Sequence, residues 1–121
     1  MLKLADFKNM SDDEVIEHIA HEYKTTDIIN YDILVAYESV GYYGCDSSSF
    51  FIMRNKKTGS WAFNDAYHCS CYGFENQFEP EDMPNEWFKR NDFLKHDFGG
   101  YDKESKENRT IVLKWVEENI K

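Results

Sequence analysis

The stretch of residues 31–71 reads YDILVAYESVGYYGCDSSSFFIMRNKKTGSWAFNDAYHCSC and contains three segments with the composition of β-strands. Branched and aromatic side chains, which favour strands, are frequent in residues 31–40, 49–54 and 60–71. A turn rich in Gly, Ser and Asp separates the first two segments, and NKKTG at residues 55–59 has the chemistry of a hairpin turn. The stretch therefore predicts a three-stranded antiparallel meander.

Alternation in the first segment predicts which face of the sheet its side chains occupy. Tyr31, Ile33, Val35 and Tyr37 recur with the period of two that a pleated strand requires. We therefore expect these four side chains to lie on one face.

Helices are expected before and after the meander. Residues 11–14, Ser-Asp-Asp-Glu, read as a capping box, and apolar residues follow at helical spacing, so we expect an amphipathic helix over residues 12–24. A short helix is expected within residues 85–95, and Asp102 is expected to cap a final helix. The apolar side of that final helix is expected to comprise Ile111, Val112, Leu113, Trp115, Val116 and Ile120. The chain is thus predicted to be one α+β domain over residues 1–121, a three-stranded antiparallel sheet packed with an N-terminal and a C-terminal helix.

Composition favours a cytoplasmic location for this domain. The 121 residues are 41% hydrophobic, enough for one core, and no apolar run approaches the roughly 18 residues of a membrane span. The first ten residues, MLKLADFKNM, lack the apolar region of a secretory signal. Three cysteines are an odd number, which argues against a disulfide framework and favours a reducing compartment. We expect a cytoplasmic protein with no membrane partner.

The formal net charge of −9 is concentrated in two zones. Residues 11–40 hold eight acidic residues and one basic residue, and residues 75–86 hold five acidic residues and no basic one. Direct binding of nucleic acid is not expected, because contacts to phosphates require a basic stripe that this chain lacks. The two zones instead indicate a protein partner with a basic surface, or simply favour solubility.

The candidate partner-binding residues come from these zones and from aromatic residues beside the second zone. Aromatic side chains in acidic, glycine-bearing loops are suited to anchoring an interface, although they also close the ends of small cores. The residues expected to contact a partner are Asp12, Asp13, Glu14, Glu17, Glu22, Tyr72, Phe74, Glu75, Phe78, Glu79, Glu81 and Asp82.

A small structural zinc site is an alternative interpretation of the cysteines. Cys45, His68, Cys69 and Cys71 offer four ligands of the types that zinc binds. The spacing of Cys69 and Cys71 is that of a strand rather than of the usual CxxC pair. If the third strand continues through them, both thiols point to one face of the sheet and His68 points to the other. A place for both thiols in the core explains the two cysteines without a metal. We therefore expect no cofactor, with zinc as the alternative.

No catalytic signature is present in the sequence. It contains no P-loop, no GxGxxG, no GxSxG and no HEXXH. His18 and His21 are expected on the solvated face of the first helix. Arg54, Lys56 and Lys57 keep open a third possibility, an unrecognised enzyme or binder of a small signalling nucleotide. The leading expectation is a protein without enzymatic activity.

The segment of residues 41–82 resembles a set of small, mostly uncharacterised proteins of bacteriophages and prophages. The shared features are the GYYG turn at residues 41–44, the HCSCYG of residues 68–73, and the acidic stretch that ends in Glu79-Pro80-Glu81. The resemblance implies a phage-encoded acidic protein that binds and inhibits or modulates a host protein, such as a defence nuclease or another nucleic-acid-handling enzyme. Mimicry of DNA is one mode that it implies.

Overall fold

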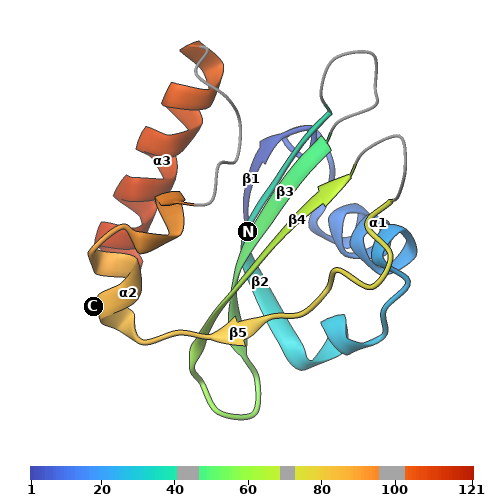
Figure 1. The fold of residues 1–121 in the computed structure, drawn as a ribbon, viewed down its shortest axis with the longest axis horizontal. Coiled ribbons are helices and arrows are strands. Elements are labelled where there is room, and N and C mark those ends of the chain that lie inside the picture. The colour runs from blue at the N-terminus through green and yellow to red at the C-terminus, as the bar shows by residue number, and fades with distance from the viewer. Residues whose placement is uncertain (41–46, 69–72, 96–102) are drawn as a thin grey trace.

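A mixed sheet of five strands forms the centre of the fold (Figure 1). The computed structural model describes residues 1–40, 47–68, 73–95 and 103–121. The strands lie side by side in the order of the sequence: β1 (Leu2–Ala5), β2 (Tyr31–Val40), β3 (Ser47–Asn55), β4 (Trp61–His68) and β5 (Glu81–Asp82). β1 pairs with β2 in parallel, and all other neighbours are antiparallel.

The predicted α+β class is confirmed, and the predicted meander forms the middle of a larger sheet. β1 and β5 add a strand at each edge, and both were absent from the prediction. β1 has four residues and β5 has two, so neither segment shows the alternation by which longer strands are recognised. Their positions follow from pairing with β2 and β4 rather than from local propensity.

A bulge in β2 changes the faces that its side chains occupy. Ile33 pairs with Met53 and Val35 pairs with Ile52, so the register skips Leu34 between them. Ile33 consequently packs into the core on one face of the sheet, whereas Val35 and Tyr37 pack into the core on the other. The prediction that all of these residues share one face was therefore wrong, because the extra residue reverses the alternation.

β3 is buried on both faces. Phe50, Phe51, Ile52 and Met53 are all 0% exposed. Phe50 and Ile52 belong to one core cluster, and Phe51 and Met53 belong to the other. Successive side chains of a strand point to opposite faces, so each face of the sheet needs its own cover.

The first helix covers one face. α1 (Asp12–Tyr23) packs Val15, Ile19 and Tyr23 against the core that contains Phe51 and Met53. The predicted capping box is confirmed, since Ser11 Oγ accepts from the Glu14 N–H at 3.1 Å and the Glu14 carboxylate accepts from the Ser11 N–H at 3.2 Å. Lys24 caps the C-terminal end of the helix, and its φ of 50° lies in the left-handed region.

The C-terminal helices cover the other face (Figure 1). They are α2 (Asn85–Lys89), a 3₁₀ helix over Asp92–Lys95, and α3 (Lys103–Asn119). Val112, Val116 and Ile120 are buried at intervals of four residues, the spacing of a helix stripe. Ile111 is 43% exposed, so its assignment to the apolar side was wrong; it lies beside that stripe rather than in it. The predicted cap, Asp102, lies outside the described residues.

Residues 73–84, the crossing segment, pass from the first face to the second around the outer edge of β4 (Figure 1). Phe74 and Phe78 pack beneath α1, in the core around Phe51. The segment then pairs with β4 through β5, and the Met83 N–H donates to the Trp61 carbonyl at 2.9 Å. Met83 itself packs against the second core. The crossing segment therefore holds both covers against the sheet.

Replacing Phe74 by Ala tests this packing. The Phe74 ring stacks on Tyr23 with a centroid separation of 4.9 Å and is 5% exposed. We expect Phe74→Ala to lower the free energy of unfolding in urea by about 3–5 kcal/mol. The control Ile29→Ala removes a side chain that is 70% exposed, and a change within about 0.5 kcal/mol is expected. Equal, small effects of the two substitutions would contradict the burial of Phe74.

Candidate functional site

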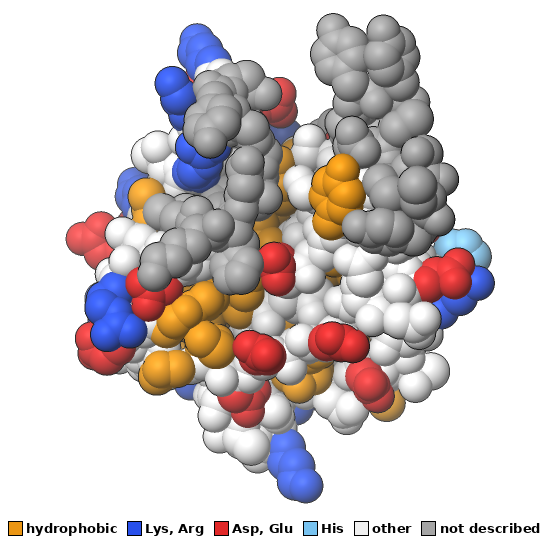
Figure 2. Space-filling view, in the orientation of Figure 1, with side chains coloured by type: hydrophobic (Ala, Val, Ile, Leu, Met, Phe, Trp, Pro, Cys, Tyr) orange, Lys and Arg blue, Asp and Glu red, His pale blue; other side chains and the backbone are white. Residues whose placement is uncertain are grey.

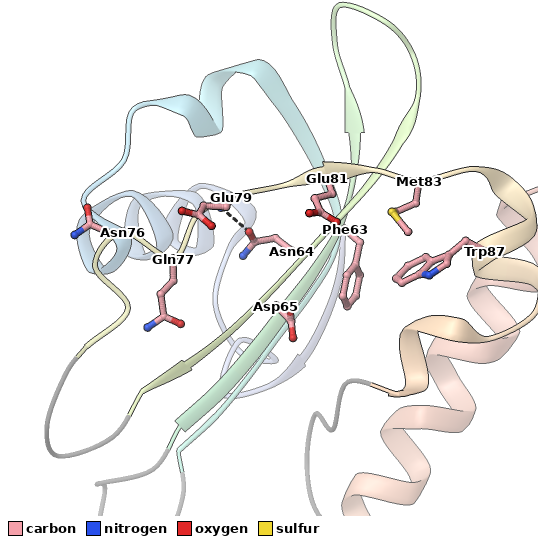
Figure 3. A pocket seen from close by; sticks show the side chains of 9 residues that line it. All are labelled: Phe63, Asn64, Asp65, Asn76, Gln77, Glu79, Glu81, Met83 and Trp87. Atoms are coloured by element: carbon pink, nitrogen blue, oxygen red, sulfur yellow. Dashed lines mark hydrogen bonds between the residues drawn. The ribbon is translucent and has the colours of Figure 1, made fainter.

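The crossing segment leaves a hollow at the outer edge of β4, which we call the edge hollow (Figure 3). Its volume is about 470 Å³. β4 forms one wall, the crossing segment forms another, and α2 closes one end. The lining residues are Phe63, Asn64, Asp65, Asn76, Gln77, Glu79, Glu81, Met83 and Trp87.

The Gln77 side chain limits the edge hollow at the end away from α2. Its Oε1 accepts from the Tyr67 N–H at 2.8 Å, and its Nε2 donates to the Tyr67 carbonyl at 2.7 Å. The same nitrogen donates to the Gly73 carbonyl at 2.7 Å. The amide thus pairs with the β4 backbone as a strand residue would, while β5 pairs with Phe63 further along. The hollow lies between these two attachments.

Asn64 connects β4 to the crossing segment and retains an unused donor. Its Oδ1 accepts from the Glu79 N–H at 2.7 Å, and the residue is only 3% exposed. Its Nδ2 is buried and has no hydrogen-bond partner among the described residues. A buried donor without an acceptor is uncommon in folded proteins.

Carboxylates surround the edge hollow. Asp65, Glu79 and Glu81 line it and are exposed, and the lining within the described part of the chain includes no Lys, Arg or His. Glu79 and Glu81 form no ion pair with any residue that the structure describes. Figure 2 shows acidic side chains across the middle of this face of the molecule, next to hydrophobic ones. The local potential is therefore negative.

The end of the edge hollow nearest α2 is apolar. Phe63, Met83 and Trp87 line it together (Figure 3). The Trp87 ring packs against Phe63 with a centroid separation of 5.1 Å, and against Phe88 at 5.0 Å in an edge-to-face arrangement. Trp87 is half-buried, so its ring is fixed by neighbours and still reaches the hollow.

Two of the acidic residues on α1 that were predicted to contact a partner form hydrogen bonds within the protein. Asp12 pairs with the Lys3 ammonium at 2.8 Å, a hydrogen bond that lowers the pKa of the Asp12 carboxyl. Glu14 is held in the capping box, and its bonds to Ser11 lower its pKa as well. Asp13, Glu17 and Glu22 are exposed along the helix.

The structure corrects the prediction that Phe74 and Phe78 are interface anchors. They are 5% and 7% exposed and fill the core beneath α1, because Phe51 and Met53 require a cover there. Glu75 pairs with Lys24 at 3.0 Å and ties the crossing segment to the end of α1. Among the other predicted contacts, Glu79, Glu81 and Asp82 are exposed, and Tyr72 lies outside the described residues.

The residues proposed for zinc fall mostly outside the described part of the chain. Cys45, Cys69 and Cys71 lie there, while His68 is described and its ring lies 5.5 Å from that of Phe74. Within residues 1–40, 47–68, 73–95 and 103–121, no group of three or more His, Cys, Asp or Glu side chains is arranged to hold a metal ion.

Two of the three cations suggested for nucleotide binding, Arg54 and Lys56, are engaged within the protein. Arg54 lies over the Trp61 ring at 4.9 Å, and its Nε donates to the Gly59 carbonyl at 2.9 Å, which braces the β3–β4 hairpin. Lys56 lies 3.8 Å from the Asp32 carboxylate. These contacts weaken the case for a phosphate site at this turn.

A partly buried contact between His18 of α1 and Glu38 of β2 was not predicted from the sequence. His18 Nε2 lies 2.8 Å from Glu38 Oε2, and Glu38 is 5% exposed. The second oxygen, Oε1, is buried without a partner among the described residues. The hydrogen bond to Glu38 is the main cause that raises the pKa of His18 above its ordinary value. The expectation that His18 lies on the solvated face of the helix was wrong, because its side chain is turned to the sheet.

Asn64, Asp65 and Trp87 were also absent from the site residues predicted from the sequence. Asn64 and Asp65 interrupt an apolar strand, and a polar side chain at a position expected to be buried signals a specific partner. Trp87 gave no such signal, because an aromatic residue in a short helix is usually part of a core.

Comparison with family models, with curated proteins and with solved structures finds no match to this chain. None of the described helices combines the length and the apolar character needed to cross a bilayer.

The pH dependence of stability tests the pair formed by His18 and Glu38. Because the pKa of His18 is raised above 6.5 in the folded state, the stabilisation by the charged pair is complete below that pH. It is lost as the pH rises through the raised pKa. Urea unfolding between about pH 5.5 and about pH 8.5 should show that Glu38→Gln costs most stability at the acidic end.

The control His21→Gln alters an exposed histidine of the same helix and should leave this pH trend unchanged. A cost of Glu38→Gln that stays constant across the range would contradict the assignment of the raised pKa of His18 to its contact with Glu38.

Proposed function

We propose that this chain binds a protein with a basic surface and inhibits or modulates it, and that the edge hollow with its carboxylates is the centre of the contact. The observation that carries the proposal is the gathering of Asp65, Glu79 and Glu81 around one hollow whose described lining contains no base. Glu79 and Glu81 are exposed and form no ion pair with any described residue, so a cationic partner would be attracted to them.

The charge of the whole chain supports the same proposal. A net charge of −9 on 121 residues creates a field that steers a basic partner toward the protein and speeds association. Grooves that bind nucleic acid are positively charged. The proposed partner is therefore a host nucleic-acid-handling enzyme or defence nuclease, with the acidic face standing in for phosphates.

Origin in a phage belongs to the same proposal and depends on the resemblance of residues 41–82. The edge hollow lies partly within that segment, since Phe63 to Glu81 belong to it. A second contact along α1 would use Asp13, Glu17 and Glu22, because Asp12 and Glu14 already have partners within the protein.

Affinity capture from bacterial lysate treated with nuclease tests the proposal. The tagged wild type is compared with the triple variant Glu79→Lys, Glu81→Lys, Asp82→Lys. A matched control, Glu104→Lys, Glu117→Lys, Glu118→Lys, makes the same charge change at exposed positions of α3. We expect the wild type and the control to retain one host protein in near-equal amounts, and the first variant to lose it by about tenfold or more.

Circular dichroism and thermal unfolding establish that both variants are folded before the capture is compared. Loss of the partner by both triple variants would mean that only overall charge matters. Recovery of the bait alone from every lysate would contradict the proposed function.

A further inference from the structure

The buried donor of Asn64 points to a ligand with an acceptor atom. The Glu79 N–H can only donate, so Oδ1 of Asn64 must face it, and the orientation of the amide is thereby fixed. Nδ2 then turns away from Glu79, toward the side of the edge hollow where Gln77 lies (Figure 3). The Gln77 amide is already bonded to Tyr67 and Gly73. A carbonyl oxygen brought by a ligand would satisfy the free donor of Asn64.

The carboxylates around the edge hollow attract a cation. No group of three carboxylate, His or Cys side chains in the described ranges is close enough together to hold one metal ion. A guanidinium group carries five N–H donors in a plane and can reach several carboxylates at once. An ammonium group is compact and strongly hydrated, and it matches such a spread of acceptors less well.

The apolar end of the edge hollow fits the rest of an arginine side chain. Trp87 offers an aromatic surface on which a guanidinium stacks, and Phe63 and Met83 beside it suit a chain of methylene groups. Carboxylates, an aromatic surface and one buried donor therefore surround a single hollow of about 470 Å³.

We propose that the edge hollow receives one arginine side chain of the partner protein. The guanidinium lies against Glu81 and stacks on Trp87, in the negative field to which Glu79 and Asp65 contribute, and a main-chain carbonyl next to that arginine accepts from Asn64 Nδ2. The inference rests on the proposed function, because it names the chemical group by which the partner is recognised.

An NMR titration of the full chain with small probes tests the arginine pocket without the partner. The probe is N-acetyl-arginine N-methylamide, and the comparison probes are the lysine and citrulline analogues. We expect the arginine probe to shift the Trp87 indole N–H and the Asn64 side-chain amide resonances. Binding of the lysine analogue should be weaker by about tenfold, because it lacks the planar donors. The uncharged citrulline analogue should not bind measurably.

Two further probes separate the parts of the proposed site. Butylguanidinium has the cation and a methylene chain but no carbonyl, so it should shift Trp87 and leave the Asn64 amide unmoved. Magnesium chloride at matched ionic strength should shift neither resonance. Saturable shifts with magnesium at both residues would overturn the proposal in favour of a metal site.

Paired substitutions locate the binding. Glu79→Gln with Glu81→Gln should weaken the arginine probe by about tenfold or more, since the charge-assisted bond to Glu81 and the neighbouring charge of Glu79 are lost. Glu117→Gln with Glu118→Gln on α3 makes the same charge change and should leave binding unchanged. Equal binding of the arginine and citrulline probes, or an unaffected Glu79 and Glu81 double variant, would overturn the arginine pocket.

The outcomes of the NMR probe titration and of the affinity capture can be told apart. If the charge-reversed triple variant loses the host protein and the arginine probe does not bind, the proposed function stands and the arginine pocket is wrong. If the probe binds as expected and every lysate yields the bait alone, the pocket stands and the proposed partner class is wrong.

Discussion

Four consecutive side chains of β3, from Phe50 to Met53, are completely buried although they alternate between two faces of the sheet. Each face must be covered for these side chains to leave water. α1 covers one face together with Phe74 and Phe78, and α2 and α3 cover the other. The chain has to change faces between the two covers, and it does so around the outer edge of β4. The crossing segment, and with it the edge hollow, follows from the burial of β3.

The crossing segment pairs with the edge of the sheet and also places charged side chains there. Gln77 and β5 each pair with part of the β4 backbone, which leaves the hollow between them. An exposed sheet edge invites pairing with other chains, and charged side chains such as Glu79 and Glu81 discourage it. We propose that the same carboxylates, together with Trp87 and the free donor of Asn64, also recognise a cationic side chain. In that proposal, protection against aggregation and recognition of a basic partner use one set of residues.

Elements with strong local signals were predictable from the sequence, and features set by distant contacts were not. The capping box at Ser11 and the composition of residues 31–71 led directly to α1 and the meander. The bulge at Leu34 reversed the faces of β2, and nothing in the local pattern marks it. Phe74 and Phe78 stand in an acidic, glycine-bearing stretch and are nevertheless buried, because Phe51 and Met53 need cover. The pair of His18 and Glu38 joins residues twenty positions apart, and the edge hollow gathers residues from β4, the crossing segment and α2.

Amide hydrogen exchange measured by NMR tests most directly whether the crossing segment is docked on β4. Three N–H groups report on it: Tyr67 donates to Gln77 at 2.8 Å, Glu79 to Asn64 at 2.7 Å, and Met83 to Trp61 at 2.9 Å. If the crossing segment is docked on β4, all three N–H groups exchange slower than in an unfolded chain by about a hundredfold or more. Exchange of these three groups at the unfolded rate, while the amides of Phe50 to Met53 stay protected, would contradict that docking.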